Sequence, residues 1–243
     1  MSALMINRGS GSRPVYKQIS ESLRQEVQNL YKAGDILPSE AELAKRYNVN
    51  RHTLRRAVDE LVEDGLVIRQ HGKGIFVLAP TIDYVIGPNT RFTENIESLG
   101  VTTHSRVLRK QIIPARGGVA EKLDIADGTQ VIFLETLREV DGKPFCISSH
   151  FLPLGRVPEV YERYQNSSLH AFLETQCAVK IKRTESLISA VTPLADDAVQ
   201  LKMPRNMPAL RVKSLNVEMD SQKPIEYVVT RFRGDTAQLS IQP

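Results

Sequence analysis

The stretch LPSEAELAKRYNVNRHTLRRAVDELVEDG, residues 37–65, predicts two helices that follow each other after a short turn. Ser39 is a good N-cap and Glu42 lies three residues later, which is the spacing of a capping box. The first helix begins there and is short. The second begins at Asn50, a residue that caps helices well, and ends near Asp64.

The second of these helices gathers positive charge at its N-terminal end. Its apolar residues Leu54, Val58 and Leu61 recur at helical spacing and predict a buried stripe. Four basic side chains lie off this stripe, namely Arg51, His52, Arg55 and Arg56. The helix dipole disfavours cations at this end, so the cluster predicts that negative charge is supplied from outside the chain. A solvated basic face is the alternative explanation.

The flanking segments complete a recognisable order. Apolar residues recur every three or four positions from Val15 to about Tyr31, which predicts a preceding amphipathic helix. The stretch GLVIRQHGKGIFVL, residues 65–78, is typical of two strands around a tight turn at residues 71–74. Three helices followed by a β-hairpin is the order of a winged helix-turn-helix. The sequence therefore predicts that DNA supplies the negative charge.

The recognition helix of such a fold enters the major groove with its N-terminal residues toward the bases. Arg51 and Arg55 lie one turn apart, so both can reach guanine edges or phosphates. His52 and Arg56 lie beside them, and the short Thr53 hydroxyl suits a phosphate. Backbone contacts are also predicted for three basic residues at the end of the first helix and in the hairpin turn, namely Lys45, Arg46 and Lys73.

The composition agrees with this prediction and excludes several classes of protein. The chain has 243 residues, a net charge of +4 and a pI of about 9.1. Residues 1–80 hold 12 Lys and Arg against 9 Asp and Glu, so the first third carries most of the positive excess. Residues 1–12 predict a disordered lead-in rather than a signal peptide, and no apolar run is long enough to cross a membrane.

Cysteine usage predicts a cytoplasmic protein without a metal site, and no cofactor is expected. Cys146 and Cys177 have neither metal-ligand spacing nor a disulfide framework, so we expect two structural thiols in a reducing compartment. No set of nucleophile, base and orienting residue stands out, so no catalytic residue is assigned and an enzyme is not expected.

The pattern changes after residue 78. A linker is predicted over residues 79–89 because this segment holds two prolines and a glycine. Strands and short helices then alternate over residues 90–243, among them a long hairpin that turns at Asp141-Gly142 and three closing strands. This arrangement predicts an α+β domain built on an antiparallel sheet.

Residues 13–78 resemble the DNA-binding domain of the GntR family of bacterial repressors, above all in GDILPSEAELAKRYNVNRHTLRRAVDELVEDGLVIRQHGKGIFV. The resemblance implies operator contacts by residues of both helices and of the hairpin turn, namely Ser39, Glu40, Arg51, Thr53, Arg55, His71 and Gly72. Asn50 stands where many members have serine, and both residues cap helices. Since one such domain reads only a few base pairs, we expect a homodimer on a palindromic operator.

Residues 90–243 resemble the HutC-type effector domain, called UTRA, which has a chorismate-lyase-like fold. Five stretches carry the resemblance in order, namely RFTENIESLG, REVDGKPF, SHFLP, SSLHAFL and IEYVVTRFRGD. The resemblance implies a ligand-responsive repressor with a small anionic effector. Within the family the similarity is greatest to regulators of phosphonate uptake and breakdown genes, which makes a phosphonate the predicted effector.

A phosphate or phosphonate group is bound well by an arginine fork with hydroxyl and imidazole donors. Related UTRA domains build their anion site at positions that match Thr93, Arg138 and Ser168. Strand alternation places Ser148 and His150 on one face of the returning strand. The candidate set is completed by Arg91, Phe92, His170, Glu226 and Phe232.

Several of these residues have structural alternatives. Arg138 could pair with Glu135 or Asp141 at the surface. The two histidines, His150 and His170, could be satisfied core or surface residues.

Ser168 could cap the helix that follows it, alone or in addition to a binding role. Glu226 could accept a proton from the ligand, or form a salt bridge with Arg231 or Arg233.

The effector class also has alternatives. Sugar-phosphate-sensing relatives tend to carry a glutamate where Ser148 stands and a tyrosine where Phe232 stands, so a compact phosphonate is favoured over an amino-sugar phosphate. Another small anion, such as a sugar phosphate or an amino-acid derivative, is the second candidate. Two alternatives concern the function of the whole protein, namely an enzyme of chorismate-lyase-like fold and a ligand-independent DNA-binding protein.

Overall fold

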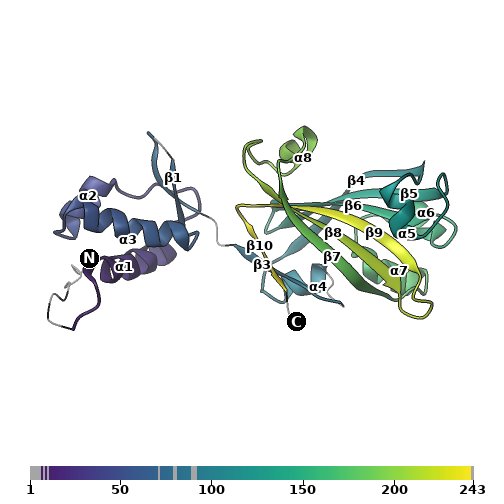
Figure 1. Cartoon of the computed structure of the whole chain (residues 1–243), viewed down its shortest axis with the longest axis horizontal. Coiled ribbons are helices and arrows are strands. Elements are labelled where there is room, and N and C mark those ends of the chain that lie inside the picture. The colour runs from purple at the N-terminus through teal and green to yellow at the C-terminus, as the bar shows by residue number, and fades with distance from the viewer. Residues whose placement is uncertain are drawn as a thin grey trace. The chain divides into compact units, whose positions relative to one another are not determined.

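The chain is described by a computed structural model that covers residues 7, 9, 11–70, 72–78, 81–88 and 92–241. It divides into two compact units, residues 1–80 and residues 81–243 (Figure 1). The predicted lead-in over residues 1–12 lies mostly outside the described residues. No helix within the described ranges is long and apolar enough to cross a membrane.

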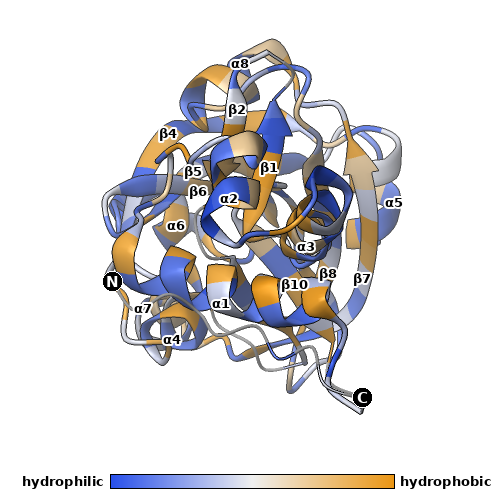
Figure 2. Ribbon diagram, turned by 90° about the vertical axis from the view of Figure 1, so that its left-hand side faces the viewer, coloured by the Kyte–Doolittle hydropathy of each residue, from blue (hydrophilic) through white to orange (hydrophobic). Residues whose placement is uncertain are grey.

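The first unit has the predicted order of three helices and a hairpin. Its described elements are α1 (Val15–Leu30), α2 (Glu40–Arg46), α3 (Arg51–Glu63), β1 (Val67–Gln70) and β2 (Gly74–Val77). Apolar residues at helical spacing on α1 and α3 form the core, where Ile19, Leu23 and Leu54 are fully buried. Figure 2 shows apolar and polar residues alternating along α1, as expected of a helix with one buried face.

Both predicted N-caps are present in the first unit. The Ser39 hydroxyl accepts a hydrogen bond from the Glu42 amide at 3.3 Å, and the Glu42 carboxylate accepts one from the Ser39 amide at 2.8 Å. The Asn50 side chain accepts a hydrogen bond from the Thr53 amide at 2.7 Å. These caps fix where α2 and α3 begin, and hence which residues lie in their first turns.

The second unit is built on a six-stranded antiparallel sheet, which confirms the predicted α+β class (Figure 1). The strand order is β4-β5-β6-β9-β8-β7. The bounds are β4 (Thr103–Pro114), β5 (Gln130–Val140), β6 (Lys143–Pro153), β7 (Ile181–Val191), β8 (Ala209–Glu218) and β9 (Pro224–Arg233). Asp141 and Gly142 join β5 to β6 with positive φ angles of 47° and 74°, as the predicted tight hairpin turn requires.

Short helices cover both faces of this sheet. They are α4 (Phe92–Glu97), α5 (Gly118–Leu123), α6 (Pro158–Arg163), α7 (Leu169–Gln176) and α8 (Ala195–Gln200). α6 and α7 pack on the face that carries Leu134 and Leu152. α5 packs beside Val131, and α8 beside Leu137 and Ile147, on the other face. The alternation of side chains along β5 and β6 produces these two apolar layers.

The predicted linker over residues 79–89 is wrong for its central part. Residues Ile82–Ile86 form strand β3, which pairs in parallel with β10 (Ala237–Ile241) and belongs to the second unit. Tyr84 and Ile86 are buried against Phe232 in the same apolar cluster. The glycine and prolines that flank β3 suggested a linker, although the alternation of apolar residues at 82, 84 and 86 is typical of a strand.

Candidate DNA-binding surface and effector pocket

The first turns of α3 present basic side chains to solvent. Arg51, His52 and Arg55 are exposed, and Thr53 is half-buried. Leu54, on the opposite side of the helix, is completely buried in the core. The sequence therefore predicted correctly which side of α3 faces outward.

Some of the predicted contact residues are already engaged within the first unit. Arg46 forms a two-point ion pair with Glu26, with N–O distances of 2.9 and 2.7 Å. The Arg56 guanidinium lies 3.9 Å from the centre of the Tyr16 ring. Glu40 accepts a hydrogen bond from Arg69 at 3.0 Å.

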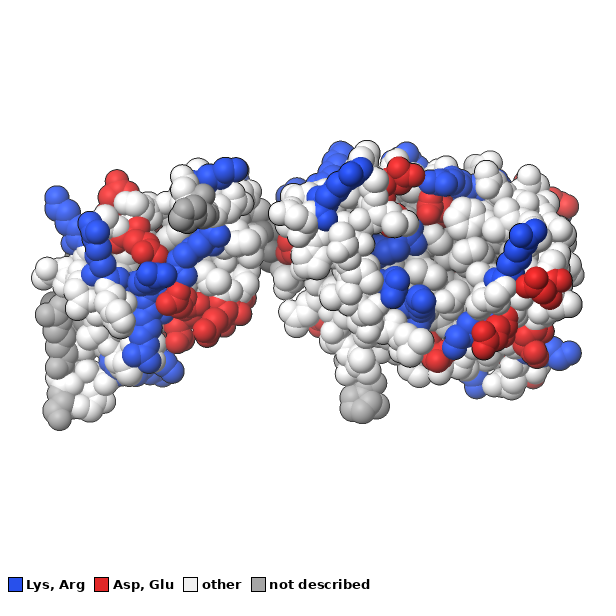
Figure 3. All heavy atoms as spheres, turned by 45° about the horizontal axis from the view of Figure 1, so that its top comes forward, with Lys and Arg blue, Asp and Glu red and all other residues white. Residues whose placement is uncertain are grey.

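Four other predicted contact residues are exposed cations that pair with no carboxylate among the described residues, namely Lys45, Arg51, Arg55 and Lys73. Figure 3 shows Lys and Arg side chains projecting from this unit. Such cations keep their full charge available for an external anion.

The hairpin turn has the backbone that the sequence suggested. Gly72 and Gly74 have positive φ angles of 72° and 116°, a conformation that favours glycine. Gly72 and Lys73 are exposed, so the turn can approach a partner closely. His71, another predicted contact, lies outside the described residues.

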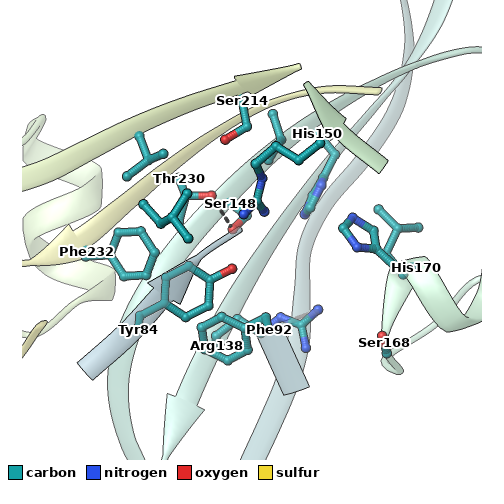
Figure 4. A pocket seen from close by; sticks show the side chains of 15 residues that line it. Tyr84, Phe92, Arg138, Ser148, His150, Ser168, His170, Ser214, Thr230 and Phe232 are labelled. Atoms are coloured by element: carbon teal, nitrogen blue, oxygen red, sulfur yellow. Dashed lines mark hydrogen bonds between the residues drawn. The ribbon is translucent and has the colours of Figure 1, made fainter. Parts of the chain in front are cut away.

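A pocket in the second unit opens on the sheet face that carries Ser148 and His150 (Figure 4). Of the residues predicted from the sequence, those that line it are Phe92, Arg138, Ser148, His150, Ser168, His170 and Phe232. The strand alternation that placed Ser148 and His150 on one face is confirmed. Thr93 contacts the pocket residue Arg138, and Arg91 lies outside the described residues.

Arg138 is the main cation of this pocket. It is 7% exposed, and its Nη1 atom donates a hydrogen bond to the Thr93 hydroxyl at 3.3 Å. Its guanidinium lies 5.1 Å from the centre of the Phe92 ring. It pairs with no carboxylate in the described part of the chain, so the alternative of a surface ion pair is wrong. A buried arginine without a counterion is strongly favourable for an anionic ligand.

The two alternative partners of Arg138 are engaged elsewhere. Glu135 accepts hydrogen bonds from Ser149 at 3.0 Å and Arg231 at 3.2 Å on the other side of the sheet. Asp141 accepts hydrogen bonds from the Thr102 amide and hydroxyl.

Hydroxyl groups accompany the arginine. The Ser148 and Thr230 hydroxyls lie 3.0 Å apart on neighbouring strands, and Figure 4 shows them together in the pocket. Ser168 accepts a hydrogen bond from the Ala171 amide at 3.4 Å as the cap of α7. Ser168 also lines the pocket, so it both caps α7 and is available to a ligand.

Glu226 lies behind the two pocket histidines. It is completely buried and accepts hydrogen bonds from His150 Nδ1 at 2.6 Å, His170 Nε2 at 3.0 Å and the Asn216 amide at 2.5 Å. The alternative of a salt bridge between Glu226 and Arg231 or Arg233 is wrong, because these arginines pair with other carboxylates. Glu226 therefore orients the histidines and does not line the pocket.

The charges in this cluster follow from burial and pairing. Burial alone would raise the pKa of Glu226, but the charges and hydrogen bonds of His170 and His150 hold it well below its usual range. Burial lowers the pKa of His150, although its bond to Glu226 acts in the opposite direction. Glu226 is therefore ionised, and the histidine hydrogen bonds satisfy its buried charge.

The sequence did not identify several residues that line the pocket, namely Tyr84, Ile86, Arg183, Val212, Ser214 and Thr230. Figure 4 shows the Tyr84 hydroxyl directed into the pocket. Tyr84 was assigned to the linker. Ser214 and Thr230 follow the same strand alternation as Ser148, so both could have been predicted to face the pocket.

Neither cysteine is suited to chemistry at neutral pH. Burial raises the pKa of Cys146 to about 12 and that of Cys177 to about 11. Both thiols are free, and no cluster of potential metal ligands occurs within the ranges that the structure describes.

Comparison with known proteins identifies the class. Residues 15–77 match the family described as bacterial regulatory proteins, gntR family, and residues 98–238 match the UTRA domain. The chain therefore belongs to the GntR family of bacterial regulators, in the HutC-type architecture with a C-terminal UTRA domain.

The alignments with individual relatives cover almost the whole chain. The probable transcriptional regulator PhnF of Escherichia coli strain K12 is 37% identical over 227 residues, which cover 93% of this chain and 94% of that protein. The transcriptional repressor NagR of Bacillus subtilis strain 168 is 28% identical, with 91% of both chains covered. The crystal structure of PhnF from Mycobacterium smegmatis is 25% identical with a TM-score of 0.67, and covers 93% of this chain and 98% of that one.

These relatives are transcriptional regulators and not enzymes, so the chain is a transcriptional regulator of the GntR/UTRA type. Regulators of this type bind operator DNA through the helix-turn-helix and a small-molecule effector through the UTRA domain.

Proposed function

We propose that this regulator is a homodimeric repressor that binds a palindromic operator and controls genes of phosphonate uptake and metabolism. A small phosphonate or phosphate ester bound in the UTRA pocket lowers the affinity of the repressor for the operator. The similarity to the regulators named PhnF supports the choice of phosphonate. Because the operator lies on the bacterial chromosome, the protein acts in the cytoplasm.

One observation supports an anionic effector above all. Arg138 is buried without a carboxylate partner in the described residues, in a pocket that the Ser148 and Thr230 hydroxyls also line. An anionic headgroup would supply the missing counterion and accept hydrogen bonds from both kinds of donor. The apolar wall of Phe92 and Phe232 suits the short alkyl group of a phosphonate.

The DNA-binding surface supports the operator part of the proposal. Arg51 and Arg55 are exposed on the first turns of α3, where a recognition helix meets base edges. Lys45 and Lys73 are placed on α2 and on the hairpin turn for phosphate contacts. Arg46 and Arg56 contribute less, because both are engaged with groups of their own unit.

The Arg138→Gln variant tests the effector site. Calorimetry with ethylphosphonate should show an affinity lower than that of the unaltered chain by about 10- to 100-fold, since a charge-assisted hydrogen bond is lost. Arg106→Gln, which removes an exposed cation from β4, should bind ethylphosphonate normally. Equal affinity of the Arg138 variant and the unaltered chain would place the anion site elsewhere.

A sugar phosphate is the second candidate, since its phosphate would meet the same arginine. Phe232 is 2% exposed and offers the pocket no hydroxyl, whereas a polyhydroxyl ligand needs several polar partners. In the same calorimetry, glucosamine 6-phosphate should therefore bind more weakly than ethylphosphonate.

A further inference from the structure

A second arginine reaches the effector pocket from the far edge of the sheet. Arg183 on β7 lines the pocket together with Arg138, and no motif of the sequence had marked it. Its backbone amide donates a hydrogen bond to the Pro88 carbonyl at 2.8 Å, and its Nη1 atom makes a marginal contact with the Gly87 carbonyl at 3.5 Å.

The Arg183 guanidinium is incompletely satisfied. Its Nε atom is buried and hydrogen-bonds to no partner. The side chain pairs with no carboxylate in the part of the chain that the structure describes. A buried donor without an acceptor is costly, so this group is poised to bind an acceptor that enters the pocket.

The two arginines lie on the strands that flank the pocket's hydroxyl residues in the sheet. In sheet order the pocket residues are Arg138 on β5, Ser148 on β6, Thr230 on β9, Ser214 on β8 and Arg183 on β7. Ser148, Thr230 and Ser214 are seen together in Figure 4. Three strands separate β5 from β7 in the sheet, so the two guanidiniums approach the pocket from different sides.

The nearby carboxylate does not neutralise this second cation. Glu226 is occupied by hydrogen bonds from His150, His170 and Asn216. A ligand with one acidic headgroup beside Arg138 would leave the half-buried Arg183 in the pocket without a counterion, which is unfavourable. A second acidic group on the ligand would remove that cost.

We propose that the effector carries two acidic groups, a phosphonate bound by Arg138 and a second acid, such as a carboxylate, bound by Arg183. Arg183 is thus the residue that selects phosphonocarboxylates over simple alkylphosphonates. The proposal rests on the proposed function, since it extends the ligand class of the same pocket.

The test compares two ligands of similar length by calorimetry on the full chain. Wild-type protein should bind 3-phosphonopropionate about 10- to 100-fold more tightly than propylphosphonate, because only the former reaches both arginines. Arg183→Gln should abolish this preference and leave the affinity for propylphosphonate within about threefold. Arg138→Gln should weaken the binding of both ligands.

The matched control is Arg211→Gln. Arg211 is an arginine of β8 that donates a hydrogen bond to Ser189 and lines a groove on the other face of the sheet. Its replacement removes one positive charge from the same unit and should leave the preference for 3-phosphonopropionate intact. Circular dichroism and the melting temperature show that each variant is folded.

Four results would overturn the inference. Arg183→Gln could keep the preference for 3-phosphonopropionate, or lose affinity equally for both ligands, which is the sign of a purely structural role. Wild-type protein could also bind the two ligands equally. In that case a loss of binding in Arg138→Gln would leave the proposed function standing. If neither ligand binds wild-type protein, the phosphonate function and the inference both fail.

Discussion

Among the basic residues of the first unit, free and engaged side chains lie close together in the sequence. Arg55 and Arg56 are neighbours, yet Arg55 projects into solvent while Arg56 lies over the Tyr16 ring. Arg46 is paired with Glu26, whereas Lys45 beside it is exposed. The charge available to DNA therefore depends on the internal partner of each cation and not on the length of the basic run.

Replacing Arg51 or Arg55 with alanine should weaken operator binding about 5- to 100-fold and relax the base preference, since each good base contact contributes about 1–3 kcal/mol. Titration of labelled operator variants at fixed salt measures both effects. Arg205→Ala, which removes an exposed cation from the second unit, is the control and should bind normally. Unchanged affinity of the two α3 variants would contradict the assignment of the recognition helix.

The buried histidine of the pocket predicts a pH dependence of stability. The pKa of His150 is lowered from 6.5 in the folded protein, mainly by burial. Below about pH 6.5 the unfolded chain therefore binds a proton that the folded chain does not, so the free energy of unfolding should fall from pH 7 to pH 5. The contribution from the lowered pKa of Glu226 is lost only at lower pH, below its usual value near 4.5.

Urea unfolding at several pH values measures this slope. His150→Gln should make the slope shallower, and His104→Gln, which replaces an exposed histidine, should not change it. Identical slopes for the two variants would show that His150 is not the group responsible.

At the scale of the elements, the cap of α3 makes a separate prediction. Asn50→Ala removes the hydrogen bond from the Thr53 amide and should lower the unfolding free energy of the first unit by about 1 kcal/mol. Asn50→Ser keeps a capping hydroxyl and should change it little. Urea denaturation followed by circular dichroism compares the two variants, and equal losses would mean that the cap is not the cause.

The elements of the first unit could be predicted from the sequence because their signals are local. The capping box of Ser39 and Glu42 and the helical spacing along α3 span only a few residues each. Strand β3 was missed because the flanking glycine and prolines suggested a linker. Its pairing with β10 was not predictable, since β10 lies at the other end of the second unit's sequence.

The pocket was predictable only in part, for similar reasons. Arg138 was found because the resemblance marked it, and Ser148 and His150 because strand alternation is a local rule. Arg183 was not found, since its approach to the pocket depends on the position of β7 at the edge of the sheet. Glu226 was identified, but its place behind the histidines depends on three strands and a helix that meet in space.

At the scale of the whole molecule, the chain itself connects the two functions. Residue 80 ends the first unit, and β3, which begins at Ile82, places Tyr84 and Ile86 in the wall of the effector pocket. A ligand in the pocket would therefore contact the strand that follows the DNA-binding unit in the chain. A coupling free energy of about 1–3 kcal/mol along this segment is enough for a transcriptional response.

The measurement that tests the central claim most directly is fluorescence anisotropy of the full chain on labelled DNA from upstream of its own gene. Salt is held fixed, because phosphate contacts make affinity steeply salt-dependent. We predict tight, sequence-specific binding of two chains per site, weakened about 5- to 100-fold by ethylphosphonate. Specific binding that ethylphosphonate leaves unchanged would contradict the proposed effector, and an absence of specific binding would contradict the operator-binding surface on α3.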